Sequence, residues 1–366
     1  MRPETPHADA HRTIGLDIPR ALAISVVVLS HVGGLSFQPF GFFGVELFFA
    51  LSGFLIGSIL YREFTASPRW SMADIRVFWA RRWWRTLPNY YLFLLISIPF
   101  HYAFGGLPTW DQFLRYLVFT QNLMNSENAF YGVSWSLAIE EWFYLLFPVA
   151  LLLFSRCGAS KRVSFLLSTT VFLVVPILIR EMLLPNTAAD SVRHMTMPRL
   201  DAVFYGVAVA FCVSKYPLSD RVRLGALVAG LALVAPFAVL FALGHDSTAV
   251  WRMMFVAVPL GFALCMPWLK TVHAFPRGLA PLGAWVRSIS LWSYSIYLMH
   301  IPVLFTVYAL FGESRQRAVV NLASKALAVV VCVVLSKLVY EQFERRLTRR
   351  RPEVRIAPVD SRTIAA

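Results

Sequence analysis

Charged side chains are scarce in this sequence of 366 residues, where they make up 15% of the chain against 58% for apolar and aromatic residues. A soluble domain of this length carries more charge, so the composition predicts an integral membrane protein in contact with membrane lipid. The net charge of +14 does not indicate a nucleic-acid partner, because the basic residues are spread between apolar runs rather than gathered in one polar domain.

Cysteine is also rare, and the four cysteines are Cys157, Cys212, Cys265 and Cys332. Their spacing fits neither a metal site nor a disulfide framework, so we interpret them as small apolar fillers and expect no metal. A cleavable signal peptide is not indicated either, since the first apolar stretch is too long and no small-residue cleavage pattern follows it.

What the sequence does contain is a series of long apolar runs. A membrane-spanning helix needs about 20 mostly apolar residues. The runs predict an all-α, polytopic protein with about ten transmembrane helices, near residues 15–35, 41–61, 87–104, 133–154, 163–184, 199–214, 224–243, 250–269, 288–311 and 318–341.

Arginine and lysine gather in alternate connections between these runs, and this asymmetry predicts that both termini face the cytoplasm. The basic connections are 62–86, 156–162, 215–223 and 270–287, followed by the tail. We therefore expect a cytoplasmic amino-terminal tail over 1–13, one membrane domain over 14–347 and a basic cytoplasmic tail over 348–366.

The first apolar run carries Arg20 and His31, which are eleven residues apart. Eleven residues of α-helix come within roughly 20° of three full turns, so both side chains share one face, and His31 lies about 16 Å deeper than Arg20. A titratable imidazole at that depth indicates function. The alternatives are a histidine that hydrogen-bonds a neighbouring helix and an arginine that reaches the headgroups.

The loop before the third run ends in FWARRWWRTLPNYY, residues 78–91. Arg82 and Arg85 are three residues apart and therefore lie on one helical face, where two guanidinium groups can grip a phosphate. A membrane anchor with an aromatic belt is equally compatible with this pattern, and anionic lipid headgroups would satisfy it as well.

Two adjacent carboxylates, Glu140 and Glu141, occur within SWSLAIEEWFYLLFP, residues 134–148. If the fourth span begins outside near Ser134, they lie about 10 Å below the outer surface, on the acceptor's side. Adjacent helical residues diverge by 100°, so the two cannot point at the same partner. One is expected to orient a histidine or bind hydroxyl groups, and the alternative is an ion pair that fixes helix packing.

Three further residues are candidates for substrate binding. Arg199 and Asp201 form a possible functional pair near the outer mouth, although a structural ion pair is equally compatible. His300 lies near mid-depth of the ninth run, where a packing or hydrogen-bonding role is the favoured alternative.

Seven segments together resemble the membrane-bound acyltransferase 3 family, from about residue 14 to residue 347. They are GLDIPRALAISVVVLSH (15–31), GFFGVELFFALSGFLIG (41–57), RRWWRTLPNYY (81–91), SWSLAIEEWFYLLFP (134–148), PRLDAVFYG (198–206), SYSIYLMHIPV (293–303) and YEQFE (340–344). The last departs from the family, which often has proline two positions after Glu344, where this chain has Arg346.

The resemblance implies an acyl-CoA-dependent O-acyltransferase of the bacterial cytoplasmic membrane that acylates an envelope or exported carbohydrate, with acetyl-CoA as the expected donor. By family analogy, Arg20 and His31 match the arginine and histidine needed for activity, and Arg82 and Arg85 match the paired arginines of the RxxR motif. His31 is expected to be the general base, with the arginines holding the phosphates of CoA at the cytoplasmic side.

Other readings remain open at this stage. An acyl-enzyme route would use Ser52 or Ser136, although neither has a partner base next to it in sequence. A transporter or flippase for a saccharide-like solute also fits ten spans with intramembrane charges, but two matching halves with interrupted helices are not seen. The chain ends shortly after its last span, so an added esterase-like domain is not expected.

Overall fold

The computed structural model describes residues 13–34, 37–104, 106–126, 130–312 and 316–352, and these ranges contain helices but no strand. The all-α prediction is therefore confirmed. The α-helices are α1 (Ile14–Val32), α2 (Gly41–Ala66), α3 (Met72–Phe104), α4 (Trp110–Leu117), α5 (Ser134–Arg156), α6 (Lys161–Leu183), α7 (Ala189–Arg193), α8 (Asp201–Lys215), α9 (Asp220–Ala242), α10 (Thr248–Leu269), α11 (Ala280–Phe311), α12 (Ala318–Val339) and α13 (Arg345–Thr348). The four cysteines lie within the described ranges and are free thiols.

Nine helices of the described chain are long and apolar enough to cross a membrane, against about ten expected. The difference is the third run, 87–104, which forms the second half of α3. Asn89, Tyr90, Tyr91 and His101 make that half less apolar than the other spans. The polytopic helical class is confirmed, and the orientation of the helices stays a prediction from the charge pattern.

The described helices belong to two compact units, each built from separate parts of the sequence. Unit 1 comprises residues 1–54 and 212–337, and unit 2 comprises residues 55–211 and 338–366. The expected amino-terminal tail, apart from residue 13, and the tail beyond residue 352 lie outside the described residues.

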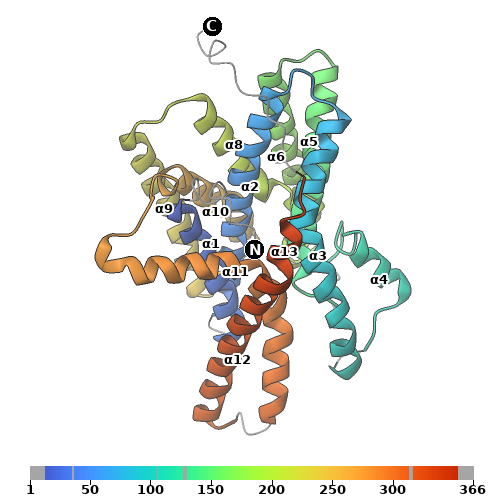
Figure 1. Ribbon diagram of the computed structural model, residues 1–366, viewed down its shortest axis with the longest axis vertical. Coiled ribbons are helices and arrows are strands. Elements are labelled where there is room, and N and C mark those ends of the chain that lie inside the picture. The colour runs from blue at the N-terminus through green and yellow to red at the C-terminus, as the bar shows by residue number, and fades with distance from the viewer. Residues whose placement is uncertain (1–12, 35–36, 105, 127–129, 313–315, 353–366) are drawn as a thin grey trace, which may run out of the picture. The chain divides into compact units, whose positions relative to one another are not determined.

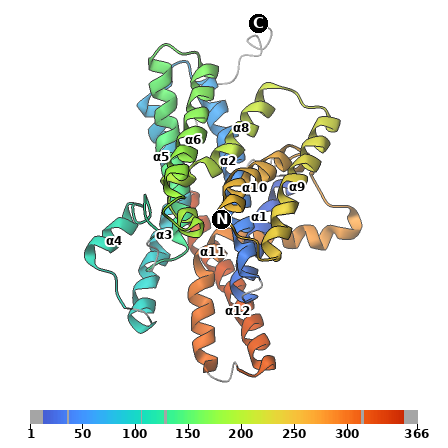
Figure 2. The same cartoon turned by 180° about the vertical axis from the view of Figure 1, so that it is seen from behind.

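In unit 1, α1 packs along α11 and α9 packs along α10, as Figures 1 and 2 show from opposite sides. Ser290 donates a hydrogen bond to Asp17 at 2.6 Å, and later along both helices the ring of His300 contacts that of His31, so α1 and α11 run in the same direction. Gly230 and Gly261 let α9 and α10 approach closely, since a Cβ added at Gly230 would lie 2.3 Å from the carbonyl oxygen of Gly261.

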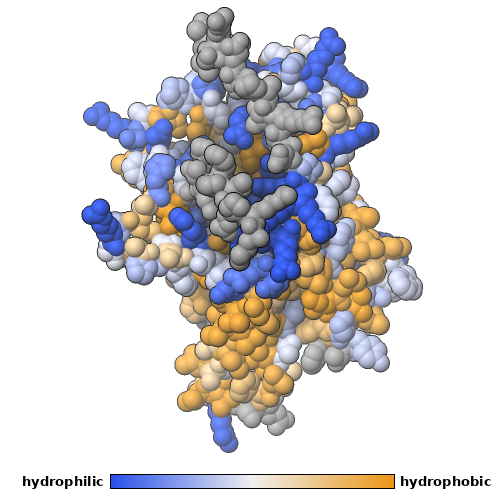
Figure 3. Space-filling model, viewed as in Figure 1, coloured by the Kyte–Doolittle hydropathy of each residue, from blue (hydrophilic) through white to orange (hydrophobic). Residues whose placement is uncertain are grey.

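The outer face of α12 in unit 1 is apolar, and Figure 3 shows this surface as a nearly continuous hydrophobic area. Val319, Leu322, Val330 and Val334 are all exposed there. Exposed apolar side chains on this scale suit contact with lipid tails rather than water.

In unit 2, α3 and α5 lie side by side and run in opposite directions. The indole nitrogen of Trp70 donates to the carbonyl oxygen of Pro148 at 3.1 Å, and that of Trp79 donates to the carbonyl oxygen of Tyr144 at 3.0 Å. Later residues of α3 thus meet earlier residues of α5. These side-chain contacts fix the register of the helix that carries the paired arginines against the helix that carries the paired glutamates.

The segment 116–119 closes over the same two helices. Tyr90, Tyr91 and Trp142 donate hydrogen bonds to its main-chain carbonyls at 2.8, 2.9 and 2.8 Å. Phe119 has a φ of 58°, a strained value for a bulky residue. The cost, about 1–3 kcal/mol, is offset by the contacts that hold the turn in place.

Candidate functional site

The residues expected to carry function are divided between the two units. Arg20, His31 and His300 belong to unit 1, whereas the paired arginines, the paired glutamates and the Arg199–Asp201 pair belong to unit 2. Each set is described within its own unit.

In unit 1, α1 is continuous from Ile14 to Val32 and therefore holds Arg20 and His31 on one helix, as the spacing predicted. Arg20 is half-buried and His31 is exposed. The Nδ1 atom of His31 lies 2.8 Å from the carbonyl oxygen of Val27. Since a carbonyl oxygen only accepts, Nδ1 carries the proton and Nε2 of the neutral ring carries the lone pair. This is the tautomer that a general base needs.

A second histidine lies against His31. The rings of His31 and His300 meet edge to face, with 4.9 Å between their centroids. His300 is 1% exposed, and its Nδ1 atom donates to the carbonyl oxygen of Tyr297 at 2.7 Å. Its Nε2 atom has no hydrogen-bond partner in the described part of the chain. The His300 ring therefore fixes one side of the space around His31.

In unit 2, the paired arginines lie in the part of α3 before its apolar half. Arg82 is buried and its guanidinium group lies 5.7 Å from the centre of the Phe78 ring, whereas Arg85 is exposed. Burial, together with the positive charge of Arg85, lowers the pKa of Arg82 to about 10. The Nε atom of Arg82 has no hydrogen-bond partner among the described residues. A desolvated cation with a spare donor beside an exposed cation is suited to bind an anion.

The paired glutamates lie near these arginines. Thr86 donates a hydrogen bond to Oε1 of Glu141 at 2.7 Å, and Glu141 is within electrostatic reach of Arg82. Tyr144 donates to Oε2 of Glu140 at 3.2 Å. Counting residues from Ser134 did not predict that the two glutamates lie near the arginine pair. Which residues meet depends instead on the antiparallel packing of α3 and α5.

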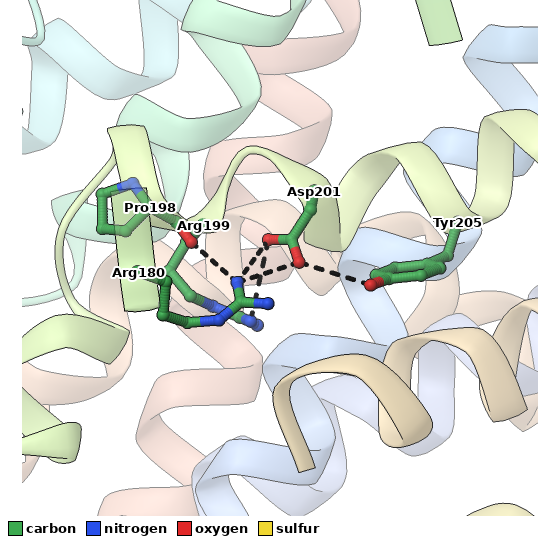
Figure 4. A network of polar contacts seen from close by, with 5 residues as sticks. All are labelled: Arg180, Pro198, Arg199, Asp201 and Tyr205. Atoms are coloured by element: carbon green, nitrogen blue, oxygen red, sulfur yellow. Dashed lines mark hydrogen bonds and ion pairs between the residues drawn. The ribbon is translucent and has the colours of Figure 1, made fainter. Parts of the chain in front are cut away.

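Arg199 and Asp201 belong to a buried ion network, shown in Figure 4, that also includes Arg180. The Nη1 atom of Arg180 contacts the two carboxylate oxygens of Asp201 at 3.0 and 2.9 Å and the carbonyl oxygen of Pro198 at 2.8 Å. Tyr205 donates to Asp201 at 3.4 Å. The charged side chains are at most 1% exposed, so the geometry favours the structural alternative for this pair.

Several partners of the candidate residues were not found by sequence reasoning. Arg180 is an ionisable residue in an apolar run, and this signal was available. Thr86 and Asn89 are small polar residues beside the RxxR segment, without a pattern of their own. Asn89 donates to Oε2 of the buried Glu344 at 2.7 Å, which gives the carboxy-terminal family segment a packing role.

The fold and these residues define a class of protein: a polytopic helical membrane protein with a histidine pair in unit 1 and a partly buried arginine pair in unit 2. A family model described as an acyltransferase domain matches residues 13–340. The chain therefore belongs to this acyltransferase family, and the family resemblance noted from the seven segments is confirmed.

Curated relatives include the peptidoglycan O-acetyltransferase OatA of Listeria monocytogenes, which is 27% identical over 79% of this chain and 49% of the relative. The O-acetyltransferase OatA of Staphylococcus aureus is 24% identical over 92% of this chain and 57% of the relative. The chain thus spans about half the length of the curated relatives it matches. No solved structure matches the chain.

The ion network predicts a large effect of Arg180→Ala on stability. The substitution leaves the Asp201 carboxylate buried without its main partner, and the free energy of unfolding should fall by about 3–5 kcal/mol. Arg223→Ala is the matched control, because Arg223 pairs with an exposed aspartate and should cost at most about 1 kcal/mol. Thermal unfolding in the same lipid or detergent compares them, and equal losses would contradict a structural role for the network.

The glutamate pair predicts unequal effects of two conservative substitutions. Glu141→Gln keeps an acceptor for Thr86 but removes the buried, titratable carboxyl group near Arg82, so the acyl-transfer rate should fall about tenfold or more. Glu140→Gln alters a half-buried carboxylate and should change the rate less. The test is the initial rate at saturating donor, with both variants checked for folding. A greater loss of rate in Glu140→Gln would show that Glu140, and not Glu141, is the more important carboxylate.

Proposed function

We propose that this protein transfers an acetyl group from acetyl-CoA at the cytoplasmic side of the membrane to a hydroxyl group of an envelope carbohydrate, with His31 as the general base. The observation that carries the proposal is the 2.8 Å contact between Nδ1 of His31 and the carbonyl oxygen of Val27: in a neutral ring, a proton on Nδ1 leaves the lone pair on Nε2. Membership of the acyltransferase family supports the reaction class.

The proposed chemistry is direct transfer. Nε2 of His31 takes the proton of the acceptor hydroxyl as its oxygen forms a bond to the thioester carbonyl carbon. The carbon–sulfur bond then breaks, and the proton passes from the imidazolium to the departing thiolate, which leaves as the free thiol of CoA. His300 positions the ring of His31 through the edge contact between them.

Arg82 and Arg85 are the proposed donor site. Arg82 brings a desolvated guanidinium group whose Nε atom has no partner in the described chain, and Arg85 is accessible to a soluble ligand. Phosphate groups match both properties, since they accept several charge-assisted hydrogen bonds. The donor is therefore an acyl-CoA whose phosphates bind this pair.

The proposed acceptor is a carbohydrate of the bacterial envelope. The name of the relative from Listeria monocytogenes specifies peptidoglycan, which makes peptidoglycan the first acceptor to test. On this proposal the protein acts in the bacterial cytoplasmic membrane, where a cytoplasmic donor and an envelope acceptor are both within reach.

Replacing His31 tests the base directly. In purified protein reconstituted in lipid, His31→Ala should lower transfer of labelled acetyl from acetyl-CoA to peptidoglycan fragments by about 10²–10⁴-fold, because the acceptor proton loses its base. His101→Ala is the matched control, since His101 is also in a long helix but does not belong to the histidine pair. Both variants should keep the unfolding temperature of the parent within a few degrees.

Two results would contradict the proposal. Equal product formation by the parent and His31→Ala would remove His31 from the reaction. Transport of a labelled saccharide across the membrane without any acyl donor, together with no acetylated product, would favour the transporter reading.

A further inference from the structure

The carboxy-terminal segment 340–352 is held against α3 within unit 2. It begins with a π-helical turn, Tyr340–Glu344, which continues into α13. At one end, Asn89 donates its hydrogen bond to Glu344 at 2.7 Å, and at the other, Nη1 of Arg81 donates to the carbonyl oxygen of Pro352 at 2.7 Å. The segment therefore has a defined path beside the arginine-rich half of α3.

This path brings another cation to the arginines of α3. After α13, the backbone turns back on itself, with the amide of Arg351 donating to the carbonyl oxygen of Thr348 at 3.3 Å. Burial lowers the pKa of the Arg351 guanidinium group, and the positive charges of Arg81 and Arg85 lower it further. Figure 3 shows hydrophilic side chains gathered over α13.

Bringing these guanidinium groups together costs electrostatic free energy unless an anion binds among them. Within the described part of the chain, the neighbouring charges that act on Arg351, those of Arg81 and Arg85, are both positive. Glu63 is within electrostatic reach of Arg81 and Arg82, but it is one carboxylate against several guanidinium groups. A phosphate monoester carries a charge close to −2 at neutral pH and offers three acceptor oxygens, so it matches the cluster better than a single carboxylate does.

We propose that Arg351 and Arg81 form a second phosphate subsite, next to the Arg82–Arg85 pair, which binds the 3′-phosphate of CoA. The inference rests on the proposed function, in which the donor is an acyl-CoA. It divides the phosphates of the donor between two sets of arginines: the pair on α3 takes the diphosphate, and the carboxy-terminal segment takes the monoester. The carboxy-terminal segment thereby selects CoA over thioesters that lack the 3′-phosphate.

The phosphate of an anionic lipid headgroup has the same chemistry, and basic segments next to a membrane often bind such lipids. The two sources differ in one property that an experiment can vary: 3′-dephospho-CoA keeps the diphosphate and the pantetheine arm but lacks the monoester. The lipid can be varied independently.

The test measures equilibrium binding of CoA and of 3′-dephospho-CoA to the full chain in nanodiscs of neutral lipid. The parent should bind CoA about tenfold or more tightly than 3′-dephospho-CoA, as expected for loss of a charge-assisted contact. Arg351→Gln should remove this preference by weakening CoA binding alone. Arg81→Gln should do the same, because it also releases Pro352. Arg350→Gln is the control, since it removes an adjacent positive charge and should keep the parental preference.

Other outcomes would overturn the subsite. Equal weakening of both ligands by Arg351→Gln, or an unchanged preference, would remove the 3′-phosphate from Arg351. An effect of Arg351→Gln that occurs with anionic lipid and not with neutral lipid would assign the cluster to headgroups. Preserved binding preference without acetyl transfer would instead contradict the proposed function while leaving the subsite intact, and a parent that binds neither ligand would overturn both.

Discussion

Polar groups placed in apolar helices must find their partners within the protein, because hydrocarbon offers no hydrogen bonds. Each charged residue of these helices therefore constrains the packing around it. Arg180 meets Asp201 where both side chains are fully buried, and Glu141 accepts its hydrogen bond from Thr86. Removing one partner of such a pair costs more than the pair contributes, so these contacts fix helix register.

The same constraint determines which nitrogen of His31 is basic. The carbonyl oxygen of Val27, four residues earlier, lies 2.8 Å from Nδ1 of the imidazole and also accepts a hydrogen bond from the hydroxyl of Ser30 at 2.7 Å. His300 uses the carbonyl oxygen of Tyr297 in a similar way. The helix backbone itself thus helps to orient both rings. One side-chain rotamer on an intact helix is enough to hold the His31 ring in a fixed orientation, as the proposed role of general base requires.

The sequence predicted what depends on local pattern. Long apolar runs predicted the helices, and the spacing of Arg20 and His31 predicted that one helix carries both. The sequence did not predict contacts between helices. The hydrogen bond from Thr86 to Glu141, for example, depends on which residues of two antiparallel helices lie at the same level. The third run, 87–104, is not a helix of its own, because it continues a helix that begins at Met72.

Arg82 and Arg85 differ in exposure, and the difference suits two tasks. A buried guanidinium group interacts more strongly with an anion than an exposed one, whereas an exposed one meets the ligand first. On the proposed assignment, the 3′-phosphate offsets repulsion among Arg81, Arg85 and Arg351, which otherwise opposes docking of the segment 340–352. Binding of the 3′-phosphate and docking of the segment 340–352 are then thermodynamically coupled. Binding stabilises the docked segment, and docking raises the affinity for the phosphate by the same factor. The carboxy-terminal segment is in this sense part of the donor site.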